Sequence, residues 1–128
     1  MATLTKTLTI SSAAGDMFTD ALNLSMNYAC PIAGGAVMKL ITMAAATDTT
    51  INTADGRSIV YLKNSSGKEN LITIFTDIDD DGATQANTTF LEIKDGEFAV
   101  FPWAGDFKLL AKAANADARL EVGVFTEA

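Results

Sequence analysis

Apolar and polar side chains alternate along much of this chain. In residues 3–10, TLTKTLTI, two leucines, an isoleucine and one lysine share one face, and threonines cover the other. Residues 21–28 repeat the pattern, with asparagine and serine on the polar face. A period of two places successive side chains on opposite faces of a strand, and β-branched threonine suits a half-exposed strand. Both segments are therefore predicted to be strands.

Seven further segments complete an all-β pattern. They are short, rich in β-branched and aromatic residues, and bounded by turn residues. Residues 13–22 are the place for one short helical turn. The pattern predicts a jelly-roll-like antiparallel β-sandwich of about eight to nine strands with little helix. The expected strands are residues 3–10, 21–28, 36–44, 59–64, 71–76, 89–94, 97–103, 107–113 and 118–125.

The length of 128 residues argues for a single domain, 1–128. Residues 1–12 are a candidate N-terminal arm or edge strand, because the first strand begins almost at residue 1 and no partner adjacent in sequence is expected. An exposed strand edge is a liability unless it is paired or covered. The arm therefore pairs with a distant strand of its own chain or adds to a neighbour's sheet.

The dipeptide Asp95-Gly96 separates two alternating runs. Asp-Gly at such a place favours a type I′ turn, which needs a positive φ at both central residues. We therefore expect residues 89–94 and 97–103 to form a β-hairpin.

Composition excludes several functional classes. The formal net charge is −7, so a nucleic-acid partner is not expected, because phosphate contacts require clustered Lys and Arg. Histidine is absent and Cys30 is the only cysteine, which removes the Ser-His-Asp and Cys-His catalytic arrangements and any intrachain disulfide. We expect no enzyme activity, no cofactor, no signal peptide and no membrane span.

The acidic run DIDDDGA, residues 77–83, matches the opening half of an EF-hand calcium loop through Asp77, Asp79 and Asp81. Position 12 of that loop is Thr88 where a bidentate glutamate is needed, and strands are predicted where an EF-hand needs helices. The EF-hand interpretation therefore fails. Two interpretations stay open: a calcium site of another kind in a β loop, and a solvated acidic loop.

Two places are candidate interfaces. Leu4 and Leu8 lie on the apolar face of the N-terminal strand, and Phe101 and Trp103 lie in the aromatic segment FAVFPW. Both faces of that segment are apolar. It is therefore either central in the sandwich or partly buried by another subunit.

Three segments of the second half, Tyr61 to Asn64, Lys94 to Trp103 and Leu120 to Phe125, resemble small virion structural proteins of tailed phages, particularly those of marine and cyanobacterial hosts. Asp95 stands where the family pattern has proline, which changes the turn type. The resemblance implies a jelly-roll-like protein that decorates or cements the phage capsid, bound to the major capsid protein as a homotrimer. It implies a place on the capsid surface of the virion after synthesis in the host cytoplasm, and it is also compatible with a tail or fibre position.

The alternative function is a non-catalytic carbohydrate-binding or fibre-associated jelly-roll module. Trp103, Tyr61 and Tyr28 are then the candidates for stacking on sugar rings.

Overall fold

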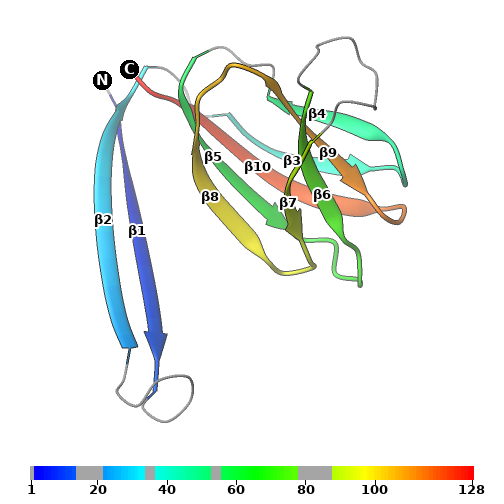
Figure 1. Cartoon of the computed structure of the whole chain (residues 1–128), viewed down its shortest axis with the longest axis horizontal. Helices are drawn as coiled ribbons and strands as arrows, with labels where there is room; N and C mark the ends of the chain where they lie inside the picture. Colours follow the sequence, from blue (N-terminus) through cyan, green and yellow to red (C-terminus); the bar gives the residue numbers. More distant parts are fainter. Residues whose placement is uncertain (1, 14–21, 34–36, 53–55, 78–87) are drawn as a thin grey trace. The chain divides into compact units, whose positions relative to one another are not determined.

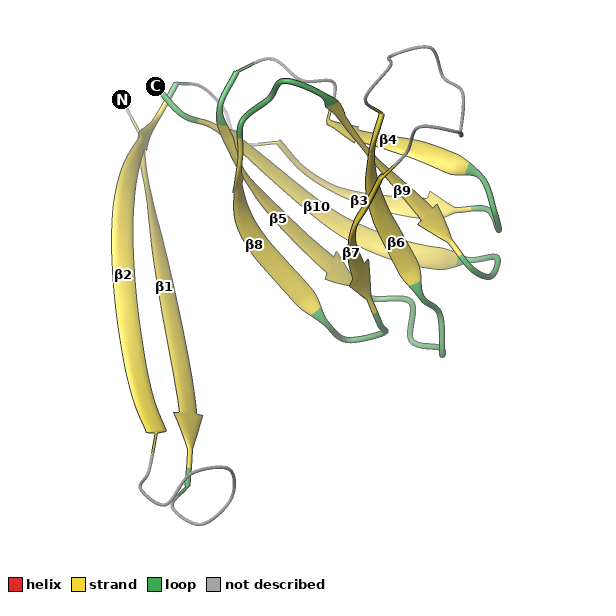
Figure 2. Cartoon of the chain, viewed as in Figure 1, coloured by secondary structure: helices red, strands yellow, loops and turns green. Residues whose placement is uncertain are grey.

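The computed structural model describes residues 2–13, 22–33, 37–52, 56–77 and 88–128. Within these ranges it contains ten strands and no helix (Figures 1 and 2). This confirms the all-β prediction. The chain separates into two compact units, residues 1–34 together with Ala128, and residues 35–127. The expected helical turn falls largely on residues 14–21, which lie outside the described residues.

The larger unit is a sandwich of two four-stranded sheets, in which all paired strands are antiparallel. The first sheet contains, in spatial order, β3 (Val37–Met43), β10 (Ala118–Thr126), β5 (Ser58–Asn64) and β8 (Phe98–Trp103). The second sheet contains, in the same sense, β4 (Asp48–Asn52), β9 (Lys108–Ala113), β6 (Ile72–Asp77) and β7 (Thr88–Ile93).

The strand order is that of a jelly roll. Strand β6 pairs with β7, β5 with β8, β4 with β9 and β3 with β10, so each pair encloses the previous one along the sequence. Alternate pairs lie in opposite sheets, which wraps the chain into two layers. The predicted fold class is therefore confirmed.

Side chains from both sheets fill the space between them. On β5 and β10, Val60, Leu62, Leu120 and Val122 are fully buried. Most of their neighbours in sequence are less buried, as the period of two requires, and Ile59 and Gly123 are exceptions. The buried core consists of Met43, Ile51, Val60, Leu62, Ile72, Ile74, Ile93, Leu109, Ala111, Ala113, Ala118, Leu120 and Val122.

The structure corrects two expectations within the sandwich. Strand β4 was not expected, because its sequence DTTIN sits in a polar stretch. The Asp95-Gly96 turn does not close a hairpin, because β7 and β8 belong to different sheets. Glu97 N–H donates to the carbonyl of Lys94 at 3.0 Å, and only Gly96 of the two central residues has a positive φ, 82°. This geometry is that of a type II turn and carries the chain from one sheet to the other.

The smaller unit is a two-stranded antiparallel ribbon, which we call the hairpin. Strand β1 (Ala2–Ser12) pairs with β2 (Leu22–Ile32) along its whole length. The partner of the N-terminal strand is thus the next strand in sequence, which the prediction had excluded. The N–H of Ala128 donates to the carbonyl of Pro31 at 3.1 Å.

A buried amide joins the two sheets at one end of the sandwich. The side-chain NH₂ of Asn64, on β5, donates to the carbonyls of Asn70 at 2.7 Å and Ile93 at 3.0 Å, and Ile93 belongs to β7. Its oxygen accepts from the hydroxyl of Ser66 at 2.6 Å and from the N–H of Ser66 at 3.2 Å. Asn70 in turn exchanges two hydrogen bonds with the backbone of Asn115, in the turn before β10. The fully buried side chain of Asn64 is therefore bonded to Ser66, to the carbonyl of Asn70 and to the carbonyl of Ile93 on β7.

We predict that Asn64→Ala lowers the free energy of unfolding of the sandwich by about 2–4 kcal/mol, because two buried carbonyls lose their donors. Urea unfolding followed by the fluorescence of Trp103, the single tryptophan, measures the change. The matched control is Asn27→Ala, an exposed asparagine on the hairpin, which should change stability by less than about 0.5 kcal/mol. Equal effects of the two substitutions would contradict the role given to Asn64.

Candidate interaction surfaces

One face of the hairpin is apolar along its length. The register places Leu8 opposite Met26 and Ile10 opposite Leu24, so these side chains share a face with Tyr28. All five are between 44% and 59% exposed. Threonine, serine and asparagine occupy most of the opposite face. The hairpin face is defined as Leu4, Lys6, Leu8, Ile10, Leu24, Met26, Tyr28 and Cys30.

Lys6 is the one charged side chain on the hairpin face. Its ammonium nitrogen lies 4.8 Å from the centroid of the Tyr28 ring, in a cation–π contact across the strand pair. Among the described residues it forms no ion pair with a carboxylate. A two-stranded ribbon is marginally stable in water by itself, and its exposed apolar face is a candidate interaction surface.

The outer face of the first sheet is largely apolar, with three charged side chains, Lys63, Arg119 and Glu121. Across its four strands, a single row contains Met38, Gly123, Tyr61 and Val100. Met38, Leu40, Phe98 and Val100 are between 49% and 65% exposed. The outer face is defined as Met38, Leu40, Ile59, Tyr61, Lys63, Phe98, Val100, Pro102, Arg119, Glu121, Gly123 and Phe125.

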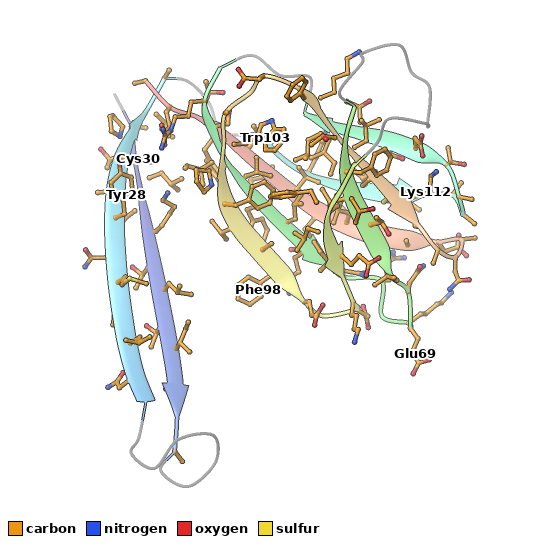
Figure 3. The ribbon with its side chains drawn as sticks, in the orientation of Figure 1. Tyr28, Cys30, Glu69, Phe98, Trp103 and Lys112 are labelled. Atoms are coloured by element: carbon orange, nitrogen blue, oxygen red, sulfur yellow. The ribbon has the colours of Figure 1, made fainter. Side chains whose placement is uncertain are left out.

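The second sheet presents the opposite character to solvent. A row across its four strands contains Asp48, Lys112, Thr73 and Glu92. Lys112 forms an ion pair with Asp48, Nζ to Oδ1 2.9 Å, and its ammonium lies over the ring of Phe75 (Figure 3). The row described on the first sheet is therefore apolar, whereas the row described on the second sheet is polar.

Glu121 lies within the apolar outer face. Its Oε2 accepts a hydrogen bond from the Tyr61 hydroxyl at 3.2 Å. Partial burial, followed by this hydrogen bond and the carboxylate charge, raises the pKa of Tyr61 above its ordinary value. Lys63 stands opposite Glu121 in register but forms no ion pair with it in the described part of the chain. The second carboxylate oxygen is therefore available to a further donor.

Aromatic rings close the side of the sandwich where β7 and β8 form the sheet edges. The β6–β7 register shifts between Ile74 and Phe75, which leaves Phe90 as a bulge. Phe90 packs edge-on against Phe101 and Trp103, with ring centroids 5.1 Å and 5.9 Å apart. The indole N–H of Trp103 donates to the carbonyl of Phe107 at 3.3 Å. We call Phe90, Phe101, Trp103 and Phe107 the aromatic edge.

The predicted interface residues divide between two of these surfaces. Leu4 and Leu8 lie on the hairpin face. Phe101 and Trp103 lie on the inward side of β8, partly buried against the core, while Phe98 is on the outward side (Figure 3). Among the described strands, β8 pairs with β5 alone and lies at a sheet edge, so it is not central in its sheet. Burial of this strand by another subunit stays a prediction.

The remaining predicted site residues are the acidic run and the candidates for stacking on sugar rings. Asp77 ends β6, whereas Asp79 and Asp81 lie outside the described residues, so the calcium interpretation stays a prediction. Of the stacking candidates, Tyr61 faces outward from the first sheet and Trp103 inward. Sequence reasoning missed Met38 and Leu40 as exposed apolar residues, although the mostly apolar run of residues 37–43 was a visible signal.

A shallow open hollow of about 400 Å³ lies beside the β7–β8 turn. It is lined by Leu91, Glu92, Ile93, Gly96, Glu97 and Phe98. The carboxylate of Glu97 accepts from the N–H of Lys94 at 2.8 Å and thus stabilises the turn.

Comparison with known proteins shows a likeness in fold. The chain matches no protein-family model, and no curated protein is significantly similar to it in sequence. Among solved structures it is similar to a chain of the Bacillus endospore appendages, described as a novel family of disulfide-linked pili, a structural protein. The identity is 20%, the match covers 77% of this chain and 91% of that chain, and the TM-score is 0.49. Nothing about the binding partners of this chain follows from a likeness of that size.

In the described ranges there is no helix of the length and apolar character that a bilayer crossing requires.

We predict that Phe90→Ala destabilises the sandwich by about 1–2 kcal/mol and shifts the emission of Trp103, because two edge-to-face ring contacts are lost. Chemical unfolding and fluorescence spectra measure both effects. Phe98→Ala is the matched control, because that ring is 65% exposed and on the outward side of the next strand. An unchanged Trp103 spectrum in Phe90→Ala would contradict the packing of the aromatic edge.

Proposed function

We propose that this chain is a structural component of a virus particle that decorates and stabilises the capsid of a tailed phage. It acts by binding at joints between capsid subunits and not by catalysis. The observation that carries the proposal is the two-sided sandwich, with an apolar outer face on one sheet and a polar row across the other. The resemblance of Tyr61 to Asn64, Lys94 to Trp103 and Leu120 to Phe125 to small virion proteins supplies the phage setting.

The mechanism follows from the surfaces. A decorating protein must turn one side to other protein subunits and one side to water. Exposed apolar side chains on edge strands supply binding energy when another subunit covers them, and the aromatic edge supplies large rings that lose little conformational entropy on contact. The ion pair and threonines of the second sheet keep the solvent side soluble. Contacts that bridge two shell subunits oppose the outward pressure of packaged DNA.

The test is the abundance of the chain in virions of the phage that encodes it. Quantitative mass spectrometry of purified particles should find hundreds of copies per particle, in constant ratio to the major capsid protein. Immunogold labelling should mark the shell. The tail tube protein of the same particles provides the internal copy-number control.

Absence from purified virions would overturn the structural role. A few copies per particle with gold at the tail tip would overturn the capsid position and place the chain on the tail or a fibre instead.

A further inference from the structure

The edge strands of the sandwich carry features that oppose pairing with a further strand. Strand β8 contains Pro102, which has no N–H to offer to a neighbour. The register of β4 with β9 and that of β7 with β6 are each broken by an irregularity. On β3, Lys39 lies opposite the fully buried Val122, so a charged side chain stands on the core-facing side of this edge strand. Proteins use each of these devices to prevent association between sheet edges.

Strand β1 of the hairpin has no proline, no glycine and no irregularity. Its register with β2 is unbroken over all 11 residues, from Ala2 to Ser12. Among the described strands it pairs with β2 alone, so its second edge has no strand partner in that part of the chain. A long, regular edge of this kind is a template for the addition of another strand.

Pro31 on β2 shows which backbone groups β1 presents at its second edge. Proline has no N–H, and the carbonyl of Pro31 accepts from the N–H of Ala128, so the backbone of Pro31 makes no ladder bond to β1. Thr3 stands opposite Pro31, and the two therefore form a non-hydrogen-bonded pair. Because the two kinds of pair alternate, the odd-numbered residues of β1 turn their N–H and C=O groups to the second edge. These residues are Thr3, Thr5, Thr7, Thr9 and Ser11.

The sequence of β1 is complementary to an antiparallel copy of itself centred on Thr7. In this register Thr7 lies opposite Thr7 of the second copy, Thr5 opposite Thr9, and Leu4 opposite Ile10. Directly opposed residues share a face, so apolar side chains meet apolar ones and hydroxyl groups meet hydroxyl groups. All 11 residues are paired, and the odd-numbered pairs form about ten backbone hydrogen bonds between the copies.

Lys6 decides against the neighbouring register. A pairing centred on Lys6 places two ammonium groups directly opposite each other, which is destabilising. A pairing centred on Leu8 leaves the first residues of β1 without a partner. Centring on Thr7 places Leu8 of the second copy opposite Lys6, and the contact of Lys6 with the Tyr28 ring draws its ammonium toward β2, away from the added strand.

We propose that β1 of one copy pairs antiparallel with β1 of a second copy, centred on Thr7, so that two hairpins form one continuous sheet in the order β2-β1-β1-β2. A two-stranded ribbon is marginally stable in water, whereas a sheet of three or more strands with an apolar face can be stable. The contact is two-fold symmetric and gives a dimer, so a homotrimer would need a contact elsewhere. It uses a strand edge and does not rest on the proposed function.

Proline substitution tests the pairing. We expect the wild-type chain to be a dimer in size-exclusion chromatography with light scattering, over about two decades of protein concentration. Thr7→Pro removes both hydrogen bonds of the central pair between the copies, and it should raise the dissociation constant of the dimer about tenfold or more.

The matched control is Asn27→Pro. Asn27 lies opposite Thr7 in the same non-hydrogen-bonded pair, so either substitution spares the hydrogen bonds between β1 and β2 and places the same ring in the hairpin. Asn27→Pro removes an N–H at the outer edge of β2 instead, and it should leave the dimer unchanged. Circular dichroism confirms that both variants keep their strand content.

Cysteine cross-linking tests the register. Thr7→Cys places two thiols opposite each other with Cα atoms about 5.5 Å apart, within the range of a disulfide. Oxidation with copper phenanthroline should therefore give a covalent dimer in non-reducing electrophoresis. Thr5→Cys should stay unlinked by itself, because its counterpart lies about 13 Å away along the strands. Mixing Thr5→Cys with Thr9→Cys should restore the cross-link. The buried Cys30 is kept in every variant.

Three results would overturn the proposal. A wild-type chain that is monomeric throughout would exclude the contact. Equal weakening by Thr7→Pro and Asn27→Pro would move the contact away from the edge of β1. Equal cross-linking of Thr5→Cys and Thr7→Cys would exclude the register. All three concern purified protein, so a failure here is distinct from absence of the chain from virions.

Discussion

The buried amide of Asn64 is the constraint on which the sandwich depends. Its NH₂ group reaches a carbonyl of β7 in the second sheet, while its backbone belongs to the first. Through Ser66 it also fixes the N–H of Arg119 at the start of β10, because the Ser66 hydroxyl accepts that hydrogen at 3.0 Å. Apolar packing holds the two layers together, but it fixes only loosely the position of one sheet relative to the other. A buried, fully bonded polar group fixes one relative position of the sheets.

The alternation of apolar and polar residues was enough to predict strands and fold class, because period two is a local property. Two features depended on the partner of each strand and were missed. The segment DTTIN lies at a sheet edge, where only Ile51 must be buried, so its sequence is nearly as polar as a loop. Asp95-Gly96 has hairpin chemistry, yet the apolar faces of β7 and β8 are buried in opposite layers, and tertiary packing overrides the local preference.

The interaction surfaces show the same division between local and global information. Leu4 and Leu8 were placed on the apolar face from alternation alone, because the other face of the hairpin is mostly polar. In β8 both faces are apolar, and only the strand order shows that Phe98 and Val100 point outward while Phe101 and Trp103 point to the core. The polar row on the second sheet was not predictable, because Asp48, Lys112, Thr73 and Glu92 come from four separate strands.

The nested pairing of the jelly roll also shapes how the chain can reach this fold. The contact between β3 and β10 joins the two ends of the sandwich, and forming it first would close almost the whole sequence into one loop. Pairing of β6 with β7 closes the shortest loop, and it brings β5 and β8 near each other. Each pair then shortens the effective loop of the next one outward. Strands that are far apart in the sequence can thereby pair in successive steps, and each step costs only a small loss of chain entropy.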